Sequence, residues 1–224
     1  MIEAVKKKVN ELLAADQSGH GIEHIERVAR LANSFAEQEN ADRELVALIA
    51  LLHDADDYKM FGQECAENMT NTKRILAECG ASDEQKEKVI SAIKTIGYSK
   101  RLAGISPETL EGKIVSDADM CDAIGATGIL RAHQFAISRG RVFFDKHIFP
   151  VEDVSAAEYK YKTEGTSVTH MFEKLLKIKN LMLTSPGRQE AIARHQIMVD
   201  FLYHLFEEEN APEWKEYLDK FLAK

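Results

Sequence analysis

The sequence has few residues that interrupt helices and no segment suited to crossing a membrane. Only 4 Pro and 12 Gly occur in 224 residues. A transmembrane helix needs about 18 or more consecutive apolar residues, and the sequence contains no such run. The first residues, MIEAVKKK, also lack the apolar stretch of a secretory signal. We therefore expect a cytoplasmic protein without a membrane partner.

Cysteine pairs and blocks of basic residues are also missing. The 3 cysteines, at positions 65, 79 and 121, are odd in number, widely spaced and outside any CxxC pattern. This spacing excludes a disulfide framework and a thiolate zinc site. The net charge is -8 and Lys and Arg do not cluster. A nucleic-acid polymer is therefore not an expected partner, and an anionic substrate would have to meet locally placed cations.

What the sequence does contain is apolar residues at helical spacing through most of its length. With 45% hydrophobic and 29% charged residues, the composition is that of a globular protein. We predict an all-α fold, a single-domain helical bundle over residues 1–224. Residues 139–165 form the one long segment without periodicity, and long loops in compact domains are usually functional or mobile. The predicted helices are 2–15, 21–39, 42–58, 64–79, 83–97, 107–126, 127–139, 167–183, 186–208 and 212–222.

One predicted helix is apolar on every face and runs directly into two polar residues. Residues 45–52 read LVALIALL, and His53 and Asp54 follow. An all-apolar helix is expected at the centre of a bundle. An imidazole and a carboxylate at its end need a partner, because an unpaired buried charge costs several kcal/mol. A metal ion would satisfy both groups.

Two further segments carry candidate ligands. His20, His24 and Arg27 lie on or near one face of the predicted helix 21–39. Asp117 and Asp119 project about 200° apart on a helix, so only one of them can face a given site. Each of these patterns, taken alone, is also typical of ordinary core histidines and acidic surface positions.

Taken in order, His24, His53-Asp54 and Asp119 resemble the H…HD…D signature of the HD-domain metal-dependent phosphohydrolase superfamily. The segments GH with HIERV, LLHD, DADMCDAIG, THMFEKL and the stretch from Thr184 to Arg194 are similar to one bacterial branch of that superfamily. The resemblance covers roughly residues 15–214. It implies an HD-type core at about 15–130, completed by C-terminal helices at about 166–222.

The resemblance also implies the ligand set His24, His53, Asp54 and Asp119. Asp119 is preferred to Asp117 because the last ligand of the signature usually follows a small apolar residue, here Ala118. Gly21 and Glu23 depart from the branch, where an acidic and a bulky aromatic residue are more common. These two departures concern the expected substrate pocket rather than the metal ligands.

Two imidazoles and two carboxylates leave open positions on one divalent ion. Manganese is our first expectation, and magnesium, cobalt, nickel and iron fit the same ligands. We expect hydrolysis of a phosphate ester or anhydride in a small nucleotide, by attack of a metal-bound water or hydroxide on phosphorus. Asp57 is the candidate to orient or deprotonate that water. The candidate contacts to the phosphorylated substrate are His20, Arg27, Lys59, His170 and Lys174.

Other functions stay open at this point. A phosphodiesterase or an alarmone hydrolase would use the same site. A non-catalytic regulator with the same fold would bind nucleotide or metal without turnover. The sequence also leaves open which base, sugar and phosphoryl bond are recognised, and whether the chain forms a homo-oligomer.

Overall fold

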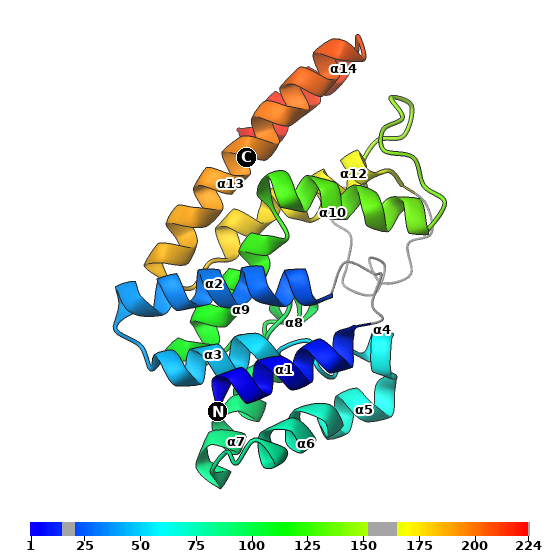
Figure 1. Ribbon diagram of the computed structural model, residues 1–224. Helices are drawn as coiled ribbons and strands as arrows, with labels where there is room; N and C mark the ends of the chain where they lie inside the picture. Colours follow the sequence, from blue (N-terminus) through cyan, green and yellow to red (C-terminus); the bar gives the residue numbers. More distant parts are fainter. Residues whose placement is uncertain (15–20, 152–164, 224) are drawn as a thin grey trace. The chain divides into compact units, whose positions relative to one another are not determined.

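The computed structural model describes residues 1–14, 21–151 and 165–223 (Figure 1). Within these ranges the regular elements are all helices, which confirms the predicted all-α class. The chain forms two compact units. Unit 1 comprises Met1–Asp122 and Met182–Arg188, and unit 2 comprises Ala123–Leu181 and Gln189–Lys224. The single domain over residues 1–224 stays a prediction.

Unit 1 is built around the apolar helix that the sequence places at the centre. Helix α3 packs against α1, α2, α7 and α9 (Figure 1). Its residues Leu48, Ile49 and Leu52 are fully buried, as expected for a helix that is apolar on every face. The helices of unit 1 are α1 (Ile2–Leu13), α2 (Ile22–Glu39), α3 (Arg43–Leu52), α4 (Tyr58–Phe61), α5 (Gln63–Asn68), α6 (Thr70–Glu78), α7 (Asp83–Ile93), α8 (Tyr98–Leu102) and α9 (Leu110–Asp122).

The prediction of one helix over residues 42–58 was wrong after Leu52. Helix α3 ends at Leu52, and His53 is its C-cap. The next residues form tight turns, in which Asp57 N donates to the Asp54 carbonyl oxygen at 3.1 Å. Helix α4 then starts at Tyr58, because the Asp57 side chain caps it by accepting from Lys59 N. His53 and Asp54 therefore lie on a helix end and a turn.

The predicted helix 64–79 was also interrupted. Met69 adopts a left-handed conformation, with φ of 53°, and separates α5 from α6. Such a conformation is costly for a residue with a side chain and persists only where its surroundings impose it. Asp56 imposes it in part, since its carboxylate accepts from Asn71 N and Thr72 N at the start of α6. A capping box formed by Ser82 and Gln85 begins α7.

Two other predicted helices differ from the observed ones, and one short helix was missed. The helix predicted at 107–126 is shorter and ends at Asp122. The helix predicted at 167–183 divides into α12 (Ser167–Glu173) and a 3-10 helix, η1 (Leu175–Leu181). The short helix α8 was not predicted, because five residues are too few to show a helical period.

Unit 2 contains α10 (Gly125–Ser138), α12, η1, the larger part of α13 (Ser185–Glu208) and α14 (Pro212–Leu222). Its core is aromatic: Trp214 lies 5.4 Å from Phe206 and 5.9 Å from Phe172, measured between ring centroids. The indole nitrogen of Trp214 donates to the Lys146 carbonyl oxygen at 3.0 Å. This bond anchors the segment 141–151, which is neither helix nor strand. The remainder of the predicted 139–165 loop, residues 152–164, lies outside the described residues.

None of the described helices combines the length and the apolar character that a membrane span requires.

Candidate metal centre

Three helices of unit 1 bring the predicted ligands together. His24 lies in the first turns of α2, His53 caps the C-terminus of α3, and Asp119 lies on α9. These three helices pack against one another in pairs. The apolar faces that drive the packing also bury both imidazoles, whose side chains are 1% exposed. The packing of these apolar faces therefore brings the polar side chains of the cluster together.

The side-chain atoms of this cluster converge on one point. The Nε2 atoms of His24 and His53 are 3.2 Å apart. The Oδ1 atom of Asp119 lies 3.5 Å from the first and 3.7 Å from the second. The three residues offer ligand atoms that all lie within 4.8 Å of one another.

Asp54 adds a second carboxylate to the cluster. Its Oδ2 atom lies 3.4 Å from His24 Nε2 and 3.6 Å from His53 Nε2. The Asp54 and Asp119 side chains are 16% and 25% exposed, whereas the imidazoles are closed off. The carboxylate side is therefore the side on which the cluster meets solvent.

Hydrogen bonds on the far side of each ring fix its orientation. His24 Nδ1 lies 2.7 Å from Asp122 Oδ2, and His53 Nδ1 lies 2.8 Å from the Ala50 carbonyl oxygen. Both partners are acceptors, so each ring carries its proton on Nδ1. The Nε2 atoms therefore direct their lone pairs into the cluster, as the ligand nitrogens of metal sites do.

The donor set fits a divalent ion. Ligands at right angles, each about 2.1 Å from an ion, lie about 3 Å apart. The separations of 3.2 to 3.7 Å in this cluster are close to that spacing.

Two imidazole lone pairs that face each other repel unless a proton or a cation lies between them. Although burial lowers the pKa of His24, hydrogen bonds to Asp122 and Asp54 outweigh it and raise that pKa to about 9.

Comparison with known proteins places this geometry in a family. The profile described as HD domain matches residues 21–124. The protein YpgQ of Bacillus subtilis is 33% identical over 204 residues, 91% of each chain. This chain belongs to the HD-domain superfamily, because the profile match is joined by 34% identity to an HD-superfamily hydrolase of known structure. The family resemblance noted in the sequence is confirmed.

Solved structures are similar to this chain over nearly its whole length. One described as an HD-superfamily hydrolase, from Bacillus thuringiensis, is 34% identical with a TM-score of 0.73, over 94% of this chain and 97% of that one. The structure of Bacillus subtilis YpgQ in complex with ADP is 30% identical with a TM-score of 0.69, over 93% and 97% of the two chains. Both structural matches cover more than nine tenths of this chain.

Asp122 and Arg27 hold the side of the His24 ring that faces away from the cluster. Asp122 is fully buried, and Arg27 donates to it from Nε to Oδ1 at 2.7 Å and from Nη2 to Oδ2 at 3.0 Å. Sequence reasoning gave Asp122 no role. It assigned Arg27 to the substrate, and the structure places the guanidinium on Asp122.

Asp117 points away from the cluster and serves another purpose. Its buried carboxylate accepts from Leu183 N at 3.0 Å and from Thr184 N and Thr184 Oγ1 at 2.7 Å each. Burial raises the pKa of this carboxyl, and these hydrogen bonds oppose the increase. Asp117 thus anchors the segment Met182–Arg188 to α9 within unit 1. The choice of Asp119 as the ligand remains a prediction, and this geometry supports it.

Asp56 is a residue that sequence reasoning missed. Its Oδ1 accepts from Asn71 N at 2.7 Å and its Oδ2 accepts from Thr72 N at 2.9 Å. This carboxylate ties the turn after His53 to the N-terminus of α6 and so holds Asp54 in place. The sequence offers one signal for this role. Met69, the N-cap of α6, has no side chain that can cap a helix, so another residue has to accept from the first N–H groups of α6.

The other predicted residues lie in several places. The Oδ1 atom of Asp57 accepts from Lys59 N at 2.8 Å. The Lys59 side chain is exposed, and its amine lies 5.8 Å from the centre of the Tyr58 ring. His20 lies outside the described residues. His170 lies on α12 and Lys174 is its C-cap, both in unit 2, so their predicted contribution to the substrate pocket stays a prediction.

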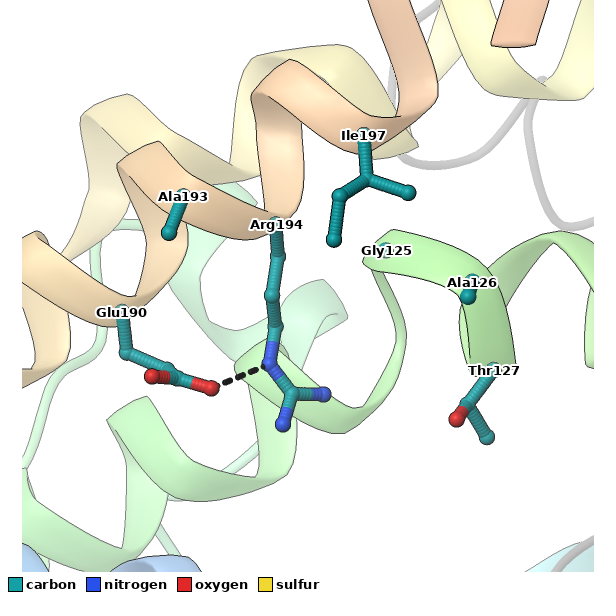
Figure 2. A pocket seen from close by; sticks show the side chains of 7 residues that line it. All are labelled: Gly125, Ala126, Thr127, Glu190, Ala193, Arg194 and Ile197. Atoms are coloured by element: carbon teal, nitrogen blue, oxygen red, sulfur yellow. Dashed lines mark hydrogen bonds and ion pairs between the residues drawn. The ribbon is translucent and has the colours of Figure 1, made fainter.

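Unit 2 has a pocket of its own, formed without any of the predicted site residues. Its volume is about 260 Å³, and it lies between the first turn of α10 (Gly125–Thr127) and the Glu190–Ile197 stretch of α13 (Figure 2). Arg194 Nε donates to Glu190 Oε1 at 2.6 Å inside it (Figure 2). The positive charge of Arg194 on the pocket wall is therefore paired with the negative charge of Glu190.

Proposed function

We propose that this chain is a metal-dependent phosphohydrolase that cleaves a phosphate ester or anhydride bond of a small nucleotide. The observation that carries the proposal is a cluster in unit 1, in which ligand atoms of His24, His53 and Asp119 lie within 4.8 Å of one another. Asp54 Oδ2 lies 3.4 and 3.6 Å from the two imidazole Nε2 atoms of that cluster. Similarity to an HD-superfamily hydrolase supports the hydrolytic reaction. The ADP complex of YpgQ supports a nucleotide as the substrate.

In this proposal His24, His53, Asp54 and Asp119 hold one divalent ion, with manganese as the first choice. Held there, the ion would lower the pKa of a water molecule and polarise a phosphoryl oxygen. The protein's own part is to hold the four ligands rigidly. The buried imidazoles close one side, and the partly exposed carboxylates leave the other side for the substrate.

Asp57 is the proposed group that orients or deprotonates the attacking water. Its Oδ1 caps α4 by accepting from Lys59 N, and this bond fixes the orientation of the Asp57 side chain. Asp57 follows Asp54 by three positions in the sequence. Its other carboxylate oxygen accepts no hydrogen bond from the described residues. A base must be held within hydrogen-bond reach of the proton that it accepts, and the cap supplies that rigidity.

The substrate phosphates need positive charge near them, because the chain carries a net charge of -8. The proposed cations are His20, Lys59, His170 and Lys174 together with Arg27. Lys59 is exposed beside the turn that carries Asp54 and Asp57. His170 lies on α12, and Lys174, the C-cap of that helix, donates its backbone N–H to the His170 carbonyl oxygen at 3.0 Å.

The test is a nucleotide panel on protein stripped of metal and then loaded with Mn²⁺. The panel contains nucleoside mono-, di- and triphosphates, cyclic and linear phosphodiesters and a guanosine alarmone, with phosphate and pyrophosphate detected separately. The proposal predicts turnover of a mononucleotide that requires the metal and is lost in Asp54→Ala. Turnover restricted to phosphodiesters or the alarmone would support the alternative hydrolases. Nucleotide binding without any turnover would make the chain a regulator.

A further inference from the structure

Arg27, Asp122 and His24 form a continuous chain of hydrogen bonds behind the metal cluster. Arg27 and His24 are three residues apart on α2, and Asp122 and Asp119 are three residues apart on α9. The two helices pack along their length. As a result His24 meets Asp119 through Nε2 and Asp122 through Nδ1, and Arg27 meets Asp122 one turn further on.

The carboxylate of Asp122 has both oxygen atoms committed. Oδ1 accepts from Arg27 Nε, and Oδ2 accepts from Arg27 Nη2 and lies 2.7 Å from His24 Nδ1. Asp122 is fully buried, and a buried carboxylate is tolerated only when it is paired and hydrogen-bonded. The planar guanidinium meets both needs at once, since it donates in a two-pronged geometry that an ammonium cannot reproduce.

We propose that Arg27 and Asp122 are a positioning pair, which fixes the ring orientation and tautomer of His24 and thereby sets the affinity of the cluster for its ion. Arg27 then acts on the site through Asp122, apart from any contact that it makes with a substrate phosphate. This inference rests on the proposed metal site. It adds two residues that determine how that site is held.

The contrast with His53 makes the role specific. His53 Nδ1 is held by the carbonyl oxygen of Ala50, which belongs to the backbone of α3 and is present whatever the side chain. His24 is held by a side chain that is itself held by another side chain. Substitutions at Arg27 or Asp122 should therefore loosen the His24 ring and leave the His53 ring unchanged, while none of the four proposed ligand residues is replaced.

The experiment compares Arg27→Lys and Arg27→Gln with Arg30→Gln as the matched control. Arg30 lies one turn further along α2 and is exposed, so its variant removes the same charge from the same helix. Mn²⁺ affinity is measured by competition with a chelating dye. Loss of the partner that orients a metal-bound histidine typically costs about 10- to 100-fold in metal affinity. We expect a loss of that size for Arg27→Gln, a smaller loss for Arg27→Lys, and no change for Arg30→Gln.

A second readout does not depend on the metal. Nuclear magnetic resonance of histidine-labelled, metal-free protein follows the exchange of the His24 Nδ1 proton with water. In the wild type and in Arg30→Gln this proton should be protected by Asp122. In Arg27→Gln and in Asp122→Asn it should exchange faster, with the His53 Nδ1 proton unchanged as the internal control.

The outcomes separate the inference from the proposed function. If Arg27→Gln keeps both the metal affinity and the protection of the His24 proton but raises KM for a nucleotide, Arg27 touches the substrate and the positioning role is wrong. If the wild type binds no metal, the proposed function fails, and the proton exchange still decides whether the pair holds His24. If Asp122→Asn does not fold, the two Arg27 variants carry the test, because Arg27 is partly exposed.

Discussion

Replacing Asp117 by Asn should destabilise the protein without weakening its affinity for metal. Replacing Asp119 by Asn should weaken the affinity for metal and leave the stability of the metal-free protein nearly unchanged. The two residues lie on the same helix, two positions apart, and differ in what they face. Asp117 is fully buried and accepts from Leu183 and Thr184. Asp119 is 25% exposed and faces the two imidazoles at 3.5 and 3.7 Å.

The magnitude at Asp117 follows from its hydrogen bonds. Two backbone N–H groups and one hydroxyl donate to its carboxylate. Bonds to a charged acceptor contribute about 1.5–3 kcal/mol each and neutral ones about 0.5–1.5, so the change to an amide costs about 1 kcal/mol per bond. Relief of the buried charge offsets part of this loss, which leaves a net destabilisation of about 2–3 kcal/mol.

Asp119→Asn has no such set of short hydrogen bonds to lose, because Asp119 Oδ1 lies 3.5 and 3.7 Å from the two imidazole nitrogens that it faces. Its effect on the metal-free protein should therefore stay below about 1 kcal/mol. Its metal affinity should fall by more than about 100-fold, because a ligand contributes more than the partners that orient it. The assays are urea unfolding in the presence of a chelator and competition titration with Mn²⁺.

Gly187→Ala provides an independent check on the stability half of this prediction. A Cβ at Gly187 would lie 2.4 Å from Asp117 Oδ2 and 2.8 Å from Thr184 Oγ1, so the anchor would have to shift. This variant should destabilise as Asp117→Asn does and leave metal affinity unchanged. The reasoning is refuted if Asp117→Asn loses as much metal affinity as Asp119→Asn, or loses affinity at unchanged stability.

Three further predictions concern the rest of the molecule. His53→Ala and Asp54→Ala should each strip the metal and abolish turnover while the helical circular dichroism stays intact; wild-type turnover at full metal occupancy in either variant would contradict the ligand set. Lys174→Ala should raise KM for the nucleotide at low salt, where charge effects are least screened, whereas Lys177→Ala on the neighbouring 3-10 helix should not; equal kinetics in the two variants would remove Lys174 from the pocket. Burial, together with a nearby lysine ammonium, lowers the pKa of His195 to about 4. Because its pKa in the unfolded chain is about 6.5, His195 should make stability fall from pH 6.5 towards pH 4, by at most about 1.4 kcal/mol per pH unit. Urea unfolding of His195→Gln should show a shallower decline over this window, and an identical decline would contradict the assignment.

The sequence predicts the fold best where a single pattern decides it. Residues 45–52 are apolar on every face, and this requires a central helix whatever the topology. The end of that helix is not predictable in the same way. The chain turns after Leu52, where Asp57 caps α4 and Asp56 reaches the start of α6. Both contacts depend on where distant segments lie.

The same distinction applies to the site. The order of His24, His53-Asp54 and Asp119 is visible in the sequence because the family signature fixes it. The roles of Asp117 and Asp122 are not, since three aspartates within six positions look alike until their partners are known. The carboxylate of Asp122 meets an imidazole 98 positions away in the chain. Helical spacing separates the sides of α9 but does not identify what each side contacts.

The most direct test of the account is an anomalous difference map from crystals grown with Mn²⁺ and measured at the manganese absorption edge. The account predicts one strong peak between the Nε2 atoms of His24 and His53 and the carboxylates of Asp54 and Asp119, absent in crystals of Asp54→Ala. A map without a peak at this cluster, or with its strongest peak elsewhere on the chain, would contradict the proposed metal centre and the hydrolytic function built on it.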